Sequence, residues 1–161
     1  MPTDDPVAWS NTEIPAAQSR KTFKGGLADD HIHIVVASDG TLYAAVKTSF
    51  DTAGQPVIGL LVRRPSGQWD PLYTVDTVGT RPIIELDEAA QCLVVIYTSK
   101  TNGGDILYRE SPLNKIAFGS RQTLMKGRLN DVTSTKQAFD GDLVVMASFG
   151  GKAKAVKLHV H

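Results

Sequence analysis

Cysteine is almost missing from this sequence. Cys92 is the only one, so the chain holds neither an intramolecular disulfide nor a Cys-x-x-Cys pair for structural zinc or redox chemistry. Cys92 stands in an apolar stretch and is interpreted as a small buried side chain. A charge excess of either sign is also missing, because Lys and Arg total 17 and Asp and Glu total 17. Without a net positive field, sequence-independent binding to nucleic acid is not expected.

Long apolar runs are missing as well. No stretch approaches the ~18 consecutive apolar residues of a membrane helix, so no membrane span is expected. The first residues, 1–6, are acidic and interrupted by proline, whereas a secretory signal is basic and then apolar. At face value this predicts a cytoplasmic location. With 161 residues, of which 42% are hydrophobic and 21% charged, the composition predicts one domain that buries a core without disulfides or a metal.

Helical periodicity is nearly absent between Asp30 and His161. Apolar runs of about four to six residues, rich in Val, Ile, Leu and Tyr, alternate there with Gly, Asp, Asn and Pro, which is typical of strands and turns. Four of the interruptions contain residues that tolerate positive φ, and each predicts a hairpin tip: 38–41, 65–68, 102–105 and 140–142. The sequence therefore predicts an all-β fold.

Three segments share one layout. Aligned on Leu42, Leu93 and Leu143, they recur at a nearly constant interval. Each is preceded by a predicted strand (31–37, 81–86 and 132–139) and followed by another (57–63, 106–110 and 153–160). In the first two repeats a fourth strand that begins with an aromatic residue is expected, at 68–73 and 116–119. Four antiparallel strands at a period of about 50 residues are the spacing of β-propeller blades.

The repeated segments also point to a family. Over roughly residues 28–161 the sequence resembles the sialidase-like and related β-propeller repeat proteins of bacteria, on the stretches 29–32, 42–48, 80–83 and 133–137. The resemblance implies a fold and no reaction. The sialidase Asp-box, Ser-x-Asp-x-Gly-x-x-Trp, is compressed at 38–43 and ends in Tyr43, and no arginine triad with its glutamate and tyrosine is found. Proteins of this kind are often extracellular, which conflicts with the missing export signal.

Three blades do not close a propeller, because closure takes about four to eight. Residues 6–10 resemble the fourth-strand pattern around Trp69, which predicts an outer strand ahead of the first blade. The chain then divides into an exchanged N-terminal strand with its linker, 1–26, and a domain of three four-stranded blades, 27–161. The N-terminal strand completes the last blade, and in a two-fold homodimer it does so in the partner, which closes a six-bladed ring. The alternatives are a fragment of a longer propeller and an incomplete sandwich-like monomer.

The loops that enter the innermost strand of each blade form one rim of the channel, which is the expected ligand site. Seven polar residues at these entries are the predicted binding residues: Asp30, His31, His33, Arg81, Asp131, Thr133 and Lys136. His31, Arg81 and Lys136 together make a cationic ring suited to a small carboxylate, sulfate or phosphate. In the alternative interpretation, Asp29, Asp30 and Asp131 pair with these cations and neutralise the rim.

Two histidine pairs offer a weaker metal hypothesis. His31 with His33, and His159 with His161, lie two residues apart and so share a strand face. A third ligand is missing and the second pair lies at a terminus, so no metal and no other cofactor is predicted.

The predicted function is therefore non-enzymatic binding of a small anionic or carbohydrate ligand at the channel rim. Tyr and Trp side chains that could stack on a sugar are interpreted mainly as packing between blades. No Gly-x-Ser-x-Gly motif and no phosphate-binding loop is present. The alternative is a sialidase-like glycoside hydrolase or another rim hydrolase, whose acid and nucleophile would come from Asp29, Asp30, Glu85 and Asp131.

Overall fold

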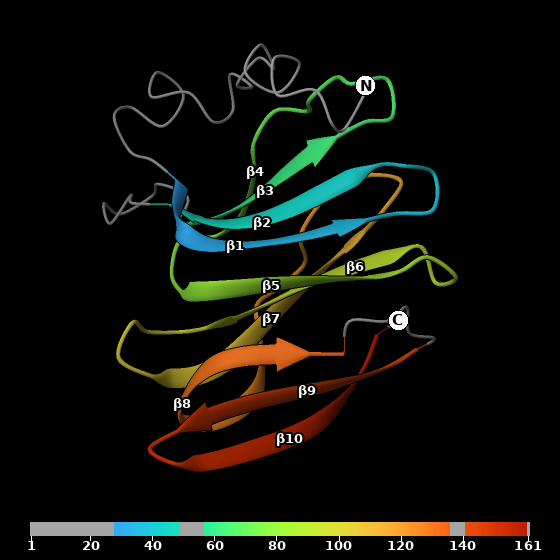
Figure 1. The fold of residues 1–161 in the computed structure, drawn as a ribbon. Coiled ribbons are helices and arrows are strands. Elements are labelled where there is room, and N and C mark those ends of the chain that lie inside the picture. The colour runs from blue at the N-terminus through green and yellow to red at the C-terminus, as the bar shows by residue number, and fades with distance from the viewer. Residues whose placement is uncertain (1–27, 49–56, 136–140, 161) are drawn as a thin grey trace, which may run out of the picture.

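The computed structural model describes residues 28–48, 57–135 and 141–160, and these residues form strands and turns without a helix. The strands are β1 (Ala28–Val36), β2 (Leu42–Thr48), β3 (Ile58–Arg63), β4 (Tyr73–Asp76), β5 (Thr80–Asp87), β6 (Cys92–Thr98), β7 (Gly104–Pro112), β8 (Gln122–Ser134), β9 (Asp142–Phe149) and β10 (Lys152–His159) (Figure 1). Within these residues, no helix has the length and apolar character to cross a membrane. The all-β prediction is confirmed.

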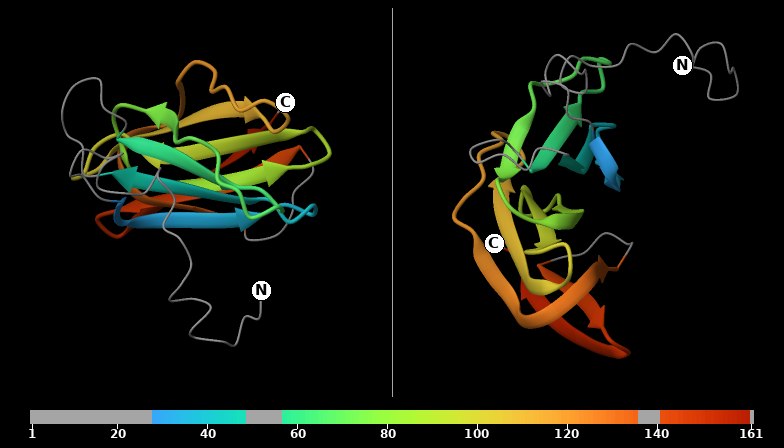
Figure 2. Two further views of the ribbon diagram at one scale, coloured as in Figure 1. Left: turned by 90° about the horizontal axis from the view of Figure 1, so that it is seen from above. Right: turned by 90° about the vertical axis from the view of Figure 1, so that its left-hand side faces the viewer.

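Two antiparallel sheets contain all ten strands. One has the order β1-β2-β3-β4, and the other the order β10-β9-β8-β7-β6-β5. The second sheet curls because β8 serves two neighbours: Gln122–Leu129 pairs with β7 and Asn130–Ser134 with β9. Gly127, at φ 140°, lies inside this strand, where a backbone without Cβ permits the bend. Viewed end-on, the strands follow an arc from β1 and β2 to β9 and β10 (Figure 2).

The register of the strand pairs repeats three times. His33 pairs with Ala45, Ile83 with Ile96, and Thr133 with Met146. The first strand of each repeat thus recurs at a constant interval, in agreement with the alignment on Leu42, Leu93 and Leu143. We name the repeats unit 1 (β1–β4), unit 2 (β5–β7 and residues 122–129 of β8) and unit 3 (residues 130–134 of β8 with β9 and β10).

The predicted fourth strands are displaced. The strand expected at 68–73 is β4 at Tyr73–Asp76, and the one expected at 116–119 begins only at Gln122. Trp69 forms an isolated bridge with Arg63 and packs with Leu72 on the outer face of unit 1, while Ile116 and Phe118 pack against the core from a loop. The aromatic pattern therefore marks the segment that covers the sheet edge. Pro71, which has no amide donor, separates Trp69 from the strand.

Some predictions fall outside the described residues. They include the exchanged strand at 6–10 with its linker, the end of the strand predicted at 132–139, and the metal candidate His161. In the described part, that strand ends at Ser134 and is continuous with the last strand of unit 2.

β6 lies at the centre of the core and is buried along its whole length. Leu93, Val95 and Tyr97 face unit 1, and Cys92, Val94 and Ile96 face unit 3. A strand covered on both faces is expected to be continuously apolar, which explains why β6 does not alternate. The buried Cys92 thiol agrees with the prediction, and burial raises its pKa.

Hairpin turns link neighbouring units along one rim. The backbone N–H of Ser38, in the β1–β2 turn of unit 1, donates to both carboxylate oxygens of Glu88 in unit 2, at 2.9 and 3.1 Å. Asp87 in unit 2 accepts from Gly141 N–H of unit 3 at 3.0 Å and from Ala90 N–H at 2.8 Å. Each unit is therefore fastened to the next outside the apolar core as well as through it.

Candidate functional site

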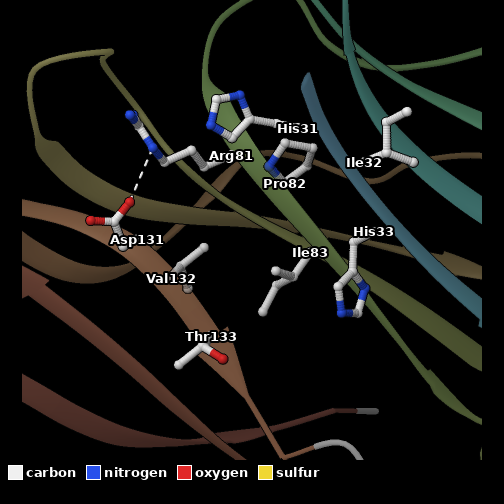
Figure 3. A pocket seen from close by; sticks show the side chains of 9 residues that line it. All are labelled: His31, Ile32, His33, Arg81, Pro82, Ile83, Asp131, Val132 and Thr133. Carbon is white, nitrogen blue, oxygen red and sulfur yellow. Dashed lines mark ion pairs between the residues drawn. The ribbon is translucent and has the colours of Figure 1, made fainter. Parts of the chain in front are cut away.

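Three equivalent segments line one groove. They are residues 31–33 of β1, 81–83 of β5 and 131–133 of β8, which hold the same position in the three units (Figure 3). The groove has a volume of about 400 Å³ and lies across all three units. One position of the repeat thus supplies its entire lining, so the groove exists only because the units stand side by side.

A β-bulge near the start of the first strand of each unit sets the direction of the side chains in these segments. The pairing register shifts between Ala28 and Ile32, between Thr80 and Ile83, and between Asn130 and Thr133. β-bulges of this kind bend a strand and redirect its side chains, and they are common at binding sites.

Arg81 and Asp131, at the same position of successive units, have φ angles of 52° and 49°. Arginine has no intrinsic preference for the left-handed region, so this strain must be offset by the contacts of the side chain.

Arg81 is held by three acceptors. Its Nε lies 3.1 Å from Oδ1 of Asp131, and its Nη1 donates to the carbonyl oxygen of Thr101 and to Oδ1 of Asn130, each at 3.1 Å. Within the described residues Nη2 makes no hydrogen bond. The Arg81 side chain is 26% exposed and that of Asp131 is 67% exposed. The pair is therefore a preorganised, electrically neutral unit whose outer atoms remain accessible from the groove.

The two histidines of the groove come from β1 in unit 1. Nδ1 of His33 accepts a hydrogen bond of 3.2 Å from the backbone N–H of Ile84, across the junction between units 1 and 2. In the neutral imidazole this places the proton on Nε2, which makes that nitrogen a donor. His31 lies two residues earlier on the same strand face, and Thr133 supplies a hydroxyl from β8.

The structure brings together five of the seven predicted binding residues: His31, His33, Arg81, Asp131 and Thr133. Asp30 is in β1 next to His31, but its side chain is outside the description, and Lys136 lies outside the described residues. Among the side chains that the structure describes, the Arg81–Asp131 pair agrees with the alternative in which aspartates neutralise the cations of the rim.

Sequence reasoning missed the apolar part of the lining and the residues that hold Arg81. Pro82, Ile83 and Val132 line the groove between the polar side chains, whereas Ile32 lies at its edge with the side chain directed away from them (Figure 3). The constant spacing between 31–33, 81–83 and 131–133 was the signal that could have found them. Asn130 and Thr101 carried no such signal, because their contacts with Arg81 depend on how the units pack.

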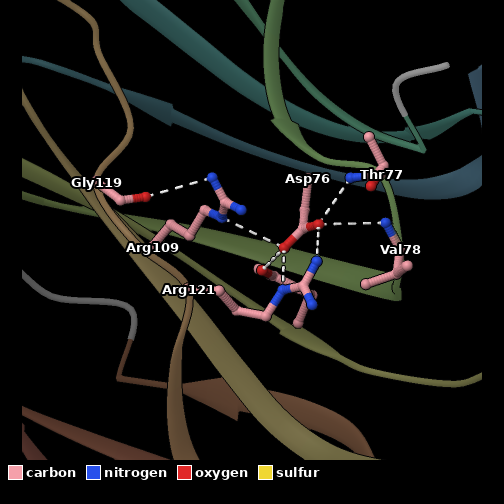
Figure 4. A network of polar contacts seen from close by, with 7 residues as sticks. Asp76, Thr77, Val78, Arg109, Gly119 and Arg121 are labelled. Carbon is pink, nitrogen blue, oxygen red and sulfur yellow. Dashed lines mark hydrogen bonds and ion pairs between the residues drawn. The ribbon is translucent and has the colours of Figure 1, made fainter. Parts of the chain in front are cut away.

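A second polar cluster lies around Asp76 (Figure 4), and none of its residues lines the groove. Asp76 is 2% exposed and receives hydrogen bonds from Arg121 Nε at 2.7 Å, from the hydroxyl of Tyr97, and from the backbone N–H groups of Thr77 and Val78 at 2.7 and 3.3 Å. Nε of Arg109 lies 3.3 Å from Oδ2 of the carboxylate.

These contacts saturate the Asp76 carboxylate. Burial alone would raise its pKa, but the hydrogen bonds from Arg121 and Tyr97 and the charge of Arg109 outweigh burial and lower it. Burial, together with the bond to Asp76, raises the pKa of Tyr97. A carboxylate with every acceptor position used is a structural joint between units 1 and 2, with no atom left for a ligand.

The described residues contain no group of three or more His, Cys, Asp or Glu side chains placed to hold a metal ion. Glu85, a predicted hydrolase carboxylate, is 6% exposed, accepts from the Ser134 hydroxyl and does not line the groove.

Comparison with known families and proteins adds no assignment. No protein-family model matches the chain, and no curated protein matches it.

Proposed function

We propose that this protein is a non-enzymatic binding protein that recognises a small polar ligand in the groove formed by residues 31–33, 81–83 and 131–133. The observation that carries the proposal is the Arg81–Asp131 pair, which is held in a strained backbone conformation at the repeated position that lines the groove. Residues held in sparsely populated conformations cluster at ligand sites.

The ligand class follows from the charge balance. Asp131 offsets the charge of Arg81, so the described lining carries donors and acceptors without a strong net charge. Sugar hydroxyls both donate and accept, and Pro82, Ile83 and Val132 offer apolar contacts for a sugar ring. A carbohydrate therefore suits the groove better than a simple anion such as sulfate, and an acidic sugar reaches Nη2 of Arg81 as well.

The chain forms half of a six-bladed β-propeller in this proposal, and a homodimer closes the ring. Three units with a common register, arranged on an arc, support the propeller (Figure 2). Two-fold symmetry would repeat the three groove segments on the opposite side of the channel.

The hydrolase alternative is less well supported. Asp131 is the only carboxylate among the described lining residues, and it is already paired with Arg81. Glycoside hydrolysis ordinarily needs two carboxyl groups about 5 to 10 Å apart on either side of the scissile bond.

Calorimetric titration with neutral hexoses, uronic acids and inorganic sulfate tests the proposal. Binding of a sugar or uronic acid is expected, and Arg81→Ala should weaken it at least about tenfold, as loss of one charge-assisted contact does. Arg64→Ala is the matched control, because Arg64 pairs with Asp70 outside the groove. Equal affinity of the Arg81→Ala and wild-type proteins would overturn the site.

A turnover assay separates the two functions. Wild-type protein is expected to leave aryl glycosides intact. Hydrolysis that is abolished by Asp131→Asn would establish the enzyme instead.

A further inference from the structure

Exposed apolar side chains gather at both ends of the repeat. The described residues include six exposed large hydrophobic side chains, and five of them lie on two sheet faces. Ile32, Ile34 and Val36 of β1 form what we name the first end face, on the side of unit 1 that points away from unit 2. Val144 and Met146 of β9 form the last end face, on the side of unit 3 that points away from unit 2.

The last end face corresponds to the face of unit 2 that unit 3 covers. Val144 and Met146 occupy in unit 3 the positions that Val94 and Ile96 occupy in unit 2. The two residues in unit 2 are 0% exposed because unit 3 covers them, whereas Val144 is 39% and Met146 45% exposed. An apolar β9 face of this kind is what a following unit would cover.

The first end face corresponds to the face of unit 2 that unit 1 covers. Ile34 is 54% exposed, and its counterpart in unit 2, Ile84, is 0% exposed. Ile84 is buried in the core that it shares with Tyr43 and Ala45 of unit 1. A preceding unit would therefore cover Ile34 in the way that unit 1 covers Ile84.

We propose that the first end face of one copy of this chain packs against the last end face of a second copy. This inference rests on the proposed homodimeric ring and names the surfaces that close it. Ala45, Ile96 and Met146 hold the same position in the three units, so the core that Ala45 and Ile84 share within the chain predicts that Met146 packs with Ile34 of the second copy. Two-fold symmetry creates two identical seams.

The polar groups around the groove are compatible with this seam. Within the chain, Arg81 pairs with Asp131 at the same position of the next unit. Across the seam the next residue in the series is His31 of the second copy, so a carboxylate would face an imidazole. The repeated position therefore brings no two carboxylates together at the seam.

Light scattering on a sizing column, over a range of concentrations, tests the seam. Wild-type protein is expected at twice the chain mass of 17.3 kDa. Ile34→Lys and Met146→Glu should each halve that mass, because each places a charge in both seams. Both side chains are about half exposed in the single chain, so these variants should fold. Val78→Lys is the matched control: Val78 is 40% exposed, lies on neither face, and its variant should keep the wild-type mass.

Mixing the two variants gives a sharper result. A mixed dimer of Ile34→Lys with Met146→Glu has one unaltered seam and one in which a lysine faces a glutamate, so equal amounts should recover the doubled mass. If the interface paired two first end faces, Met146→Glu alone would have no effect and mixing would restore nothing.

Three results would overturn the inference: a wild-type monomer at every concentration, a dimer that Ile34→Lys leaves intact, or failure of the mixture to recover the doubled mass. A monomer that still binds sugar would leave the groove in place and remove the ring. A dimer that survives Ile34→Lys would leave the ring in place with another contact.

Discussion

At the scale of single residues, buried charge is placed where the units meet. Asp76 is the clearest example, because a carboxylate with 2% exposure joins unit 1 to two arginines and a tyrosine of unit 2. Removing one partner of such a buried pair lowers the stability of the fold, because the remaining charged side chain is still shielded from water but no longer has an opposite charge beside it.

Asp76→Asn should destabilise the fold by about 3–5 kcal/mol, because it leaves Arg109 and Arg121 without a charge partner. Urea unfolding measures the change. Asp142→Asn is the matched control, since Asp142 pairs with Lys157 and His159 on the surface, and its loss of stability should be much smaller. Equal losses in the two variants would contradict a joint at Asp76.

The same carboxylate makes stability depend on pH. The folded-state pKa of Asp76 lies below its ordinary value of 3.8, so in acid the unfolded chain takes up the proton first. The stabilisation by Asp76 is therefore complete above about pH 4 to 5 and is lost as the pH falls through the folded-state pKa. Between pH 6 and pH 3, the free energy of unfolding should fall more steeply for the wild type than for Asp76→Asn. Parallel curves would contradict the lowered pKa.

At the scale of elements, the short β4–β5 turn sets how units 1 and 2 meet. Gly79 lies in this turn at φ +118°, and a Cβ there would lie 2.6 Å from Cδ2 of Tyr97 and 3.2 Å from the carbonyl oxygen of Thr98. Because Tyr97 is fully buried and donates to Asp76, its ring has no room to move away.

Gly79→Ala should therefore cost about 2–4 kcal/mol, from backbone strain and overpacking together. Gly40→Ala in the β1–β2 turn separates the two causes. Its φ is +85° and nothing lies within 4 Å of an added Cβ, so only the conformational cost of about 1 kcal/mol remains. Thermal unfolding of the two variants gives the comparison, and a smaller loss for Gly79→Ala would be inconsistent with this geometry.

At the scale of the whole molecule, the units form a chain of nearest neighbours, as repeat proteins do. Two adjacent residues of unit 2 contact the two neighbouring units. Asp87 accepts a hydrogen bond from Gly141 of unit 3, and Glu88 accepts one from Ser38 of unit 1. The two carboxylates should therefore protect different ends of the protein.

Hydrogen exchange of the backbone amides shows which end of the protein each carboxylate protects. Asp87→Ala should cost about 1–3 kcal/mol and speed exchange mainly in β9 and β10, since Asp87 is 1% exposed. Glu88→Ala should act mainly on the β1–β2 turn and cost less, because its bonds to Ser38 are exposed. The same exchange pattern in both variants would argue against nearest-neighbour coupling.

Local chemistry was sufficient to predict the first three strands of each repeat, most hairpin tips and the repeat itself. Turn residues act over four positions, so Gly40 and Gly67 mark their turns whatever surrounds them. The fourth strands were misplaced because Trp69 and Phe118 report burial, and a loop that covers a sheet edge buries an aromatic ring as well as a strand does. That distinction depends on neighbouring strands.

The sequence by itself therefore determined the all-β class, the nearly constant period of the repeat and five polar residues of the candidate site. Only the tertiary structure decided that Arg81 is paired with Asp131, that Asp76 joins two units and that Ile34 and Met146 are exposed. The physical reason is the separation along the chain over which each interaction acts. Alternation and turn formation act between residues close in the chain. The contacts of Arg121 with Asp76 and of Arg81 with Asn130 join residues 45 and 49 positions apart, whose distance is set by how whole units pack.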